Sequence, residues 1–206
     1  MTTTAIRQAT SMDTDDFDPL VEFYGKWTME LAERYLPIPG VPASKYECWD
    51  GRLYMAPAEA AQNSYGALKL GRLLMPGAEA AGYYVYGAVN LAMGRPDRWL
   101  QPDMTILRSP ETGTWVAAEN CVMPIEFVSP DSRQRDLIHK PLRYAELEIP
   151  WYMTVELDND KGYAIAVLHR LGEVSYVPVV KGLAGQRFEM TVPFEAAFDP
   201  GDLLVR

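Results

Sequence analysis

The sequence predicts one mixed α/β (α+β) domain built around a sheet of six or more strands. Apolar runs of strand length alternate with segments whose apolar residues recur at helical spacing, and turn residues separate them. The chain has 206 residues, of which 48% are hydrophobic and 23% charged, as in a globular domain with a real core. Because no internal repeat or linker interrupts residues 17–206, we expect a single domain there.

The first ordered element is expected to be a helix. Residues 1–16 are polar, rich in Thr and then acidic, which predicts a flexible N-terminal tail. Asp18 suits the N-cap position and Pro19 the first helical position. Apolar and aromatic residues then recur at helical spacing, so the helix is predicted to run to about Leu36, where Pro37 stops it.

A β-hairpin is predicted next, because residues 45–49 and 52–56 flank Asp50-Gly51, a dipeptide typical of two-residue turns. The later predicted segments are a helix at about 60–75 ended by Pro76-Gly77, strands at 83–86, 89–93, 102–107 and 122–128, a helix at about 131–147, and strands at 151–157, 163–170 and 174–180. Loops are expected at 95–101 and 108–120, and short extended pieces at 188–205.

Two acids stand in segments that read as central strands. Asp103 follows Pro102, and Glu126 lies inside the apolar run 122–128. A buried carboxylate must shift its pKa, pair with a cation or bind a metal. If the two strands are neighbours, both carboxylates can converge at one end of the sheet, where they would suit Mg²⁺. Such an ion polarises a phosphodiester and acidifies a bound water, so the pair predicts a metal-dependent phosphodiester-cleaving site.

The segment after Glu126 adds a lysine to this hypothesis. Asp136, Lys140 and Tyr144 share one helix face at four-residue spacing, and the Lys140 ammonium could stabilise charge on a phosphate or orient water. The alternative is a surface pair between Asp136 and Lys140 worth at most about 0.5 kcal/mol, and spacing alone favours it. Pro141 forbids one helical hydrogen bond, so the helix is expected to start late or kink there.

A third acid, Glu47, lies in the predicted hairpin and shares its strand face with Lys45 and Trp49. Taken alone, it reads as a polar residue on a half-exposed hairpin. The net charge of −9 and the pI of about 4.8 argue against binding duplex DNA by charge alone. Basic residues nevertheless cluster beside the candidate site, namely Arg133, Arg135, His139, Lys140 and Arg143.

Several classes of protein are disfavoured. No apolar run approaches the roughly 20 residues that span a bilayer, and the N-terminus lacks the apolar core of a signal peptide, so a cytoplasmic protein without a membrane partner is expected. Cys48 and Cys121 read as buried thiols in a reducing compartment, and the absence of CxxC disfavours zinc. An unrelated hydrolase has little support, because GxSxG is missing and His139 and His169 lack the context of a triad.

Four motifs follow one another along the chain. They are the hairpin string from Tyr46 to Pro57, the strand Pro102-Asp103-Met104-Thr105-Ile106, the series Glu126…Ser129-Pro130…Asp136…Lys140…Tyr144, and Ile149-Pro150-Trp151-Tyr152 with the strand that ends at Asp158. In this order they resemble the Uma-two family of restriction endonucleases, in the PD-(D/E)xK nuclease superfamily, over about residues 17–205.

The resemblance implies a restriction-endonuclease-like core, with a central mixed sheet flanked by helices. By it, Asp103 and Glu126 are metal ligands for Mg²⁺ or Mn²⁺, Glu47 is an additional acidic site residue, and Lys140 replaces the lysine usually found two residues after the glutamate. The implied activity is an endonuclease acting on nucleic acid, foremost DNA. A homodimer is compatible with it, because many nucleases of this superfamily pair to address two strands.

The chain departs from the family pattern at three positions. Val128 stands where the strand motif has its lysine, Asn63 where many relatives have a histidine, and Pro141 where a small or apolar residue often follows the helix lysine. Two hypotheses therefore stay open. One is a magnesium-dependent endonuclease, and the other is a catalytically degenerate nuclease fold that binds protein or nucleic acid.

Overall fold

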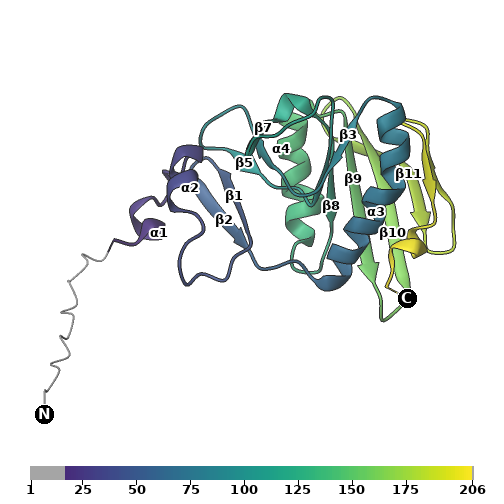
Figure 1. Cartoon of the computed structure of the whole chain (residues 1–206), viewed down its shortest axis with the longest axis horizontal. Coiled ribbons are helices and arrows are strands. Elements are labelled where there is room, and N and C mark those ends of the chain that lie inside the picture. Colours follow the sequence, from purple (N-terminus) through teal and green to yellow (C-terminus); the bar gives the residue numbers. More distant parts are fainter. Residues whose placement is uncertain (1–16, 206) are drawn as a thin grey trace, which may run out of the picture.

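The structure is a computed structural model that describes residues 17–205 as a mixed α/β fold (Figure 1). The tail predicted at residues 1–16 lies outside the described residues. The helices are α1 (Pro19–Glu22), α2 (Met29–Tyr35), α3 (Ala61–Ala80) and α4 (Lys140–Glu146), and α4 continues a π-helical turn at Arg135–His139. Short 3-10 turns lie at Ala118–Asn120 and Pro200–Leu203. None of the described helices combines the length and apolar character needed to cross a membrane.

The strands form two main sheets and a small hairpin. They are β1 (Lys45–Trp49), β2 (Arg52–Ala56), β3 (Tyr84–Tyr86), β4 (Asn90–Ala92), β5 (Trp99–Leu100), β6 (Met104–Leu107), β7 (Trp115–Ala117), β8 (Cys121–Phe127), β9 (Trp151–Asp158), β10 (Tyr163–Leu171), β11 (Tyr176–Leu183), β12 (Phe188–Met190) and β13 (Ala196–Phe198). The larger sheet has the order β11-β10-β9-β8-β6-β3, with β8 and β9 parallel and the other neighbours antiparallel. The smaller sheet has the order β2-β1-β5-β4-β7.

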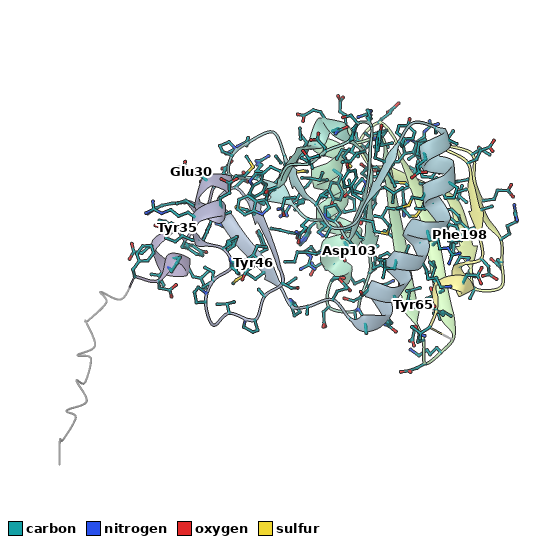
Figure 2. The ribbon with its side chains drawn as sticks, in the orientation of Figure 1. Glu30, Tyr35, Tyr46, Tyr65, Asp103 and Phe198 are labelled. Carbon is teal, nitrogen blue, oxygen red and sulfur yellow. The ribbon has the colours of Figure 1, made fainter. Side chains whose placement is uncertain are left out.

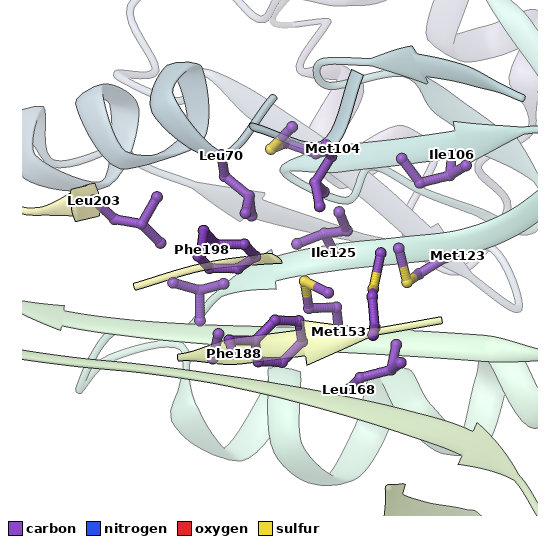
Figure 3. Close-up of a cluster of buried hydrophobic side chains, with 14 of the residues drawn as sticks. Leu70, Met104, Ile106, Met123, Ile125, Met153, Leu168, Phe188, Phe198 and Leu203 are labelled. Atoms are coloured by element: carbon purple, nitrogen blue, oxygen red, sulfur yellow. The ribbon is translucent and has the colours of Figure 1, made fainter. Parts of the chain in front are cut away.

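Helix α3 covers one face of the larger sheet, and the opposite face meets the π turn and α4. The main core lies on the α3 side, where Leu70 packs over Met104, Ile125 and Met153 (Figure 3). Since side chains alternate along a strand, the neighbour of Ile125 in β8, Glu126, points to the other face. At this position, β8 therefore presents an acid, and not an apolar side chain, to α4.

The predicted hairpin is present, but the first predicted helix is wrong in its extent. The helix that begins at Pro19 with Asp18 as its N-cap ends at Glu22, and α2 begins anew after Thr28. Gly25, three residues beyond the last helical residue, has a φ of +71°, in the left-handed region, and keeps the chain from continuing as one helix. The aromatic residues at helical spacing come from two helices that contribute to one small core.

Helix α3 does not end at Pro76-Gly77 as predicted, but continues to Ala80. Gly77 is required by packing instead. A Cβ atom there would lie 1.8 Å from the backbone oxygen of Glu195. The segments predicted as loops at 95–101 and 108–120 contain the short strands β5 and β7, which are too brief to give a periodic signal.

Candidate active site

The two strand acids meet at adjacent strand ends. Met104 of β6 pairs with Ile125 of β8, so Asp103, just before β6, lies beside Glu126. One oxygen of Asp103, Oδ2, accepts a hydrogen bond from the backbone N–H of Phe127 at 2.7 Å. The predicted juxtaposition of Asp103 and Glu126 is therefore present. Figure 2 shows Asp103 in the middle of the molecule.

The β1–β2 hairpin of the smaller sheet also contributes side chains to this site. Glu47 and Lys45 are two residues apart in β1 and so share a strand face. Glu47 is buried, and its Oε1 accepts from the backbone N–H of Gln101 at 3.0 Å. The Lys45 ammonium forms an ion pair with Oδ1 of Asp103. Glu47 is thus part of the acid cluster and not a half-exposed surface residue.

Lys140 lies at the centre of these acids, with 0% of its surface exposed. Its Nζ atom is 2.9 and 3.0 Å from the two carboxylate oxygens of Glu126. It is also 2.9 Å from Oε1 of Glu47 and 3.5 Å from Oδ1 of Asp136. The alternative of a solvated Asp136–Lys140 surface pair is therefore wrong, because both side chains are buried.

The π turn explains how Lys140 is presented. The backbone N–H of Lys140 bonds to the carbonyl of Arg135, five residues earlier, and Pro141 has no N–H to continue the series. The carbonyl of Asp136 would then lack its helical donor. The buried hydroxyl of Tyr152 donates to that carbonyl instead. The kink expected at Pro141 is thus a π turn, held by a tyrosine from β9.

The electrostatics of the cluster are set by burial and by mutual charge. Burial raises the pKa of Glu126 to about 8, with further contributions from Asp103 and Asp136 against that of Lys140. The pKa of Glu47 is lowered, because Lys140 and Lys45 outweigh its burial. Tyr144 donates a hydrogen bond to Oε1 of Glu126 at 2.8 Å. Burial therefore raises the pKa of Glu126 by more than the nearby Lys140 ammonium lowers it.

A cleft of about 1310 Å³ opens onto this cluster. Asp103, Glu126, Lys45 and Asp136 contribute to its lining. Glu47 is 3% exposed and Lys140 is 0% exposed, and neither lines the cleft. Asp103 and Lys45 thus keep some solvent contact at the cleft, whereas Glu126 and Asp136, 1% and 2% exposed, form its inner wall in front of Glu47 and Lys140.

The carboxylates that line the cleft fit a hard divalent cation. Among residues 17–205, no three His, Cys, Asp or Glu side chains form a ready-made metal cage. Mg²⁺ needs none, since it is usually held by one or two carboxylates together with water and substrate phosphate. Asp103 and Glu126 supply two carboxylates at the cleft, and Oδ1 of buried Asp136 accepts no hydrogen bond.

The other residues singled out in the sequence have structural partners. Val128 is 5% exposed at the end of β8, and its N–H bonds to the carbonyl of Val155. Asn63 lies in the first turn of α3, lines the cleft and donates to Glu59 at 2.7 Å. Cys48 and Cys121 are free and buried, as expected, and burial raises the pKa of both thiols.

The residues of the predicted basic cluster have different partners and do not form one basic surface. Arg133 pairs with Glu156, and Arg143 stacks over the ring of Trp49. Lys140 lies within the acid cluster, and Arg135 lines the cleft.

Sequence reasoning noted Lys45 only as a neighbour of Glu47. The signal was the two-residue spacing, which places both on one face of the hairpin. Tyr152 was noted only as part of a family motif, and its role was missed, because a tyrosine in an apolar strand reads as core.

A mixed sheet with acids at adjacent strand ends and helices on both faces is the architecture of a restriction-endonuclease-like fold. Residues 32–199 match the sequence model of the Uma2 family, described as a putative restriction endonuclease, so the chain belongs to that family. Its fold is similar to the crystal structure of a putative nuclease belonging to DUF820 from Anabaena variabilis ATCC 29413. That likeness has a TM-score of 0.60 at 13% identity and covers 86% of this chain and 97% of that one. No curated protein matches the chain significantly.

Proposed function

We propose that the protein is a Mg²⁺- or Mn²⁺-dependent endonuclease that hydrolyses phosphodiester bonds in nucleic acid, foremost DNA. The observation that carries the proposal is that Asp103 and Glu126 line one cleft from adjacent strand ends. Membership of the Uma2 family supports the same reaction class.

In this proposal, Asp103 and Glu126 hold the divalent cation, which supplies charge neutralisation of the phosphate and a more acidic water. The remaining residues position these acids. Lys140 donates to both oxygens of Glu126, and Tyr144 donates to one of them, so the carboxylate has a fixed orientation. Glu47 completes the partners of the Lys140 ammonium from the hairpin side.

The test is metal-dependent cleavage of plasmid and oligonucleotide DNA by the purified protein and by Glu126→Gln. The variant is expected to lose about 100-fold or more in cleavage rate, because the amide is a far poorer ligand for a hard cation. Glu156→Gln is the matched control, since Glu156 lies in neighbouring β9 and pairs with Arg133. Equal activity of wild type and Glu126→Gln would reject the proposal.

The second candidate is a non-catalytic module of the same fold. Its support is the net charge of −9 and the valine at position 128. Calorimetric titration with Mn²⁺ separates the two. Saturable binding by wild type that is lost in Asp103→Asn counts against the module, and absence of binding favours it.

The proposal also includes a cellular setting. The two buried free thiols fit a reducing cytoplasm. Pairing of two copies would let one site address each strand of a duplex.

A further inference from the structure

Two lysines belong to the acid cluster, and they differ in what they can reach. Lys140 is wholly buried and does not line the cleft. An ammonium has three donor hydrogens, and that of Lys140 faces Glu126, Glu47 and Asp136. Reaching a substrate would require Lys140 to abandon a buried carboxylate, which is strongly unfavourable. Lys140 is therefore a positioning residue.

Lys45 has the opposite environment. Its side chain lines the cleft and retains 15% exposure. Its ion pair is with Asp103, the acid proposed to bind the metal, and Asp103 is separately held by the N–H of Phe127. The described residues thus give this ammonium one carboxylate partner. A divalent cation on Asp103 would compete with Lys45 for that carboxylate and would release the ammonium beside the cleft.

We infer that Lys45, and not Lys140, is the lysine that contacts the substrate. Its ammonium pairs with Asp103 in the metal-free protein and with a phosphate oxygen of the nucleic acid in the complex. The inference rests on the proposed function and names the group that binds the phosphate. A lysine suits this role, because it binds phosphate as a mobile point charge on a flexible stem.

The experiment compares wild type with Lys45→Met, Lys45→Arg and the control Lys161→Met, whose lysine is 79% exposed in the β9–β10 turn. Short labelled DNA is titrated by fluorescence anisotropy in Ca²⁺, at several salt concentrations. Mn²⁺ affinity is measured by calorimetry, and folding by thermal denaturation. These readouts do not depend on turnover.

Lys45→Met is expected to weaken DNA binding about tenfold and to lower the salt slope by about one phosphate contact. Its Mn²⁺ affinity should equal or exceed that of wild type, because the ammonium no longer competes for Asp103. Lys45→Arg should recover part of the DNA affinity, and Lys161→Met should match wild type in all readouts.

Two results would overturn the inference. One is a Lys45→Met protein with wild-type DNA affinity and salt slope. The other is joint loss of Mn²⁺ and DNA binding, which would make Lys45 a structural partner of Asp103. If the wild-type protein binds DNA through Lys45 but does not cleave it in Mg²⁺ or Mn²⁺, the proposed endonuclease activity is rejected and the inference about Lys45 stands. Wild type that does not bind DNA rejects both.

Discussion

At the scale of single residues, the buried ammonium of Lys140 dominates the energetics of the site. It lies within 3.5 Å of three carboxylates, and all four residues are at most 3% exposed. A buried ion pair is seldom a large net source of stability, but removing one partner leaves the others without compensation. The three buried carboxylates therefore rely on the Lys140 ammonium to balance their charge in the folded protein.

We expect Lys140→Met to lower the free energy of unfolding by about 3–5 kcal/mol, because buried acids lose their shared cation. Urea denaturation measures the change. Lys45→Met provides the comparison, since Lys45 has one partner and some solvent access, and its loss should be clearly smaller. Equal losses for the two variants would contradict the division into a buried and an accessible lysine.

The strand pattern and the family motifs predicted that Asp103, Glu126 and Lys140 would lie close together. They did not predict that Lys140 would be fully buried. An acid and a lysine four residues apart look the same on a surface and in a core. Burial is decided by the sheet against which the helix packs, and that sheet is assembled from distant segments. The pairing of Lys45 with Asp103 spans 58 residues, so no local pattern indicates it.

At the scale of elements, the π turn is the least ordinary piece of the fold. The N–H of Lys140 bonds to the Arg135 carbonyl and Pro141 has no N–H, so the Asp136 carbonyl has no helical donor and accepts from the Tyr152 hydroxyl. Such turns are rare and are frequent at functional sites. Here the turn sets where Asp136 and Lys140 point, and a residue of β9 holds the turn by direct contact on the sheet face that packs against α4.

Tyr152→Phe is expected to cost about 1–3 kcal/mol of unfolding free energy, because it leaves a buried carbonyl without a donor. Chemical denaturation measures the cost. Tyr163→Phe, in neighbouring β10 and 40% exposed, should leave the midpoint unchanged. A Tyr152→Phe protein as stable as wild type would show that the carbonyl finds another donor.

The errors in the predicted helix ends share one physical cause. Pro76-Gly77 was read as a helix stop, yet α3 continues through it to Ala80, and Gly77 allows close packing against the backbone of Glu195. In the first predicted helix, by contrast, the apolar spacing runs across Gly25, whose left-handed backbone lies between two separate helices. A glycine marks either a backbone reversal or a tight contact, and only the tertiary structure distinguishes them.

At the scale of the whole molecule, the candidate site joins two sheets. β1 of the smaller sheet supplies Glu47 and Lys45, while the larger sheet supplies the other acids. The joint is reinforced at Trp49, whose ring lies 4.3 Å from the guanidinium carbon of Arg98 and 4.6 Å from that of Arg143 in α4. The position of the hairpin relative to α4 thus depends on this stack.

Trp49→Ala should destabilise the protein by at least about 1–2 kcal/mol, through loss of two cation–π contacts and apolar packing. Hydrogen exchange should increase in β1 and α4, and change little in β10 and β11. Trp49→Phe retains an aromatic face and should recover most of the protection. An equal increase in hydrogen exchange in all strands of both sheets of Trp49→Ala would contradict a local role for Trp49 between the hairpin and α4.

Lys45 and Lys140 also affect whether the fold needs a bound metal ion. Domains whose acidic or thiolate ligands face only one another collapse when a chelator removes their ion. Here cations carried by the polypeptide already sit among the carboxylates, as internal counter-ions. If the proposed divalent ion binds here, its loading would therefore follow folding and would be reversible, because the fold already holds counter-ions for its acids.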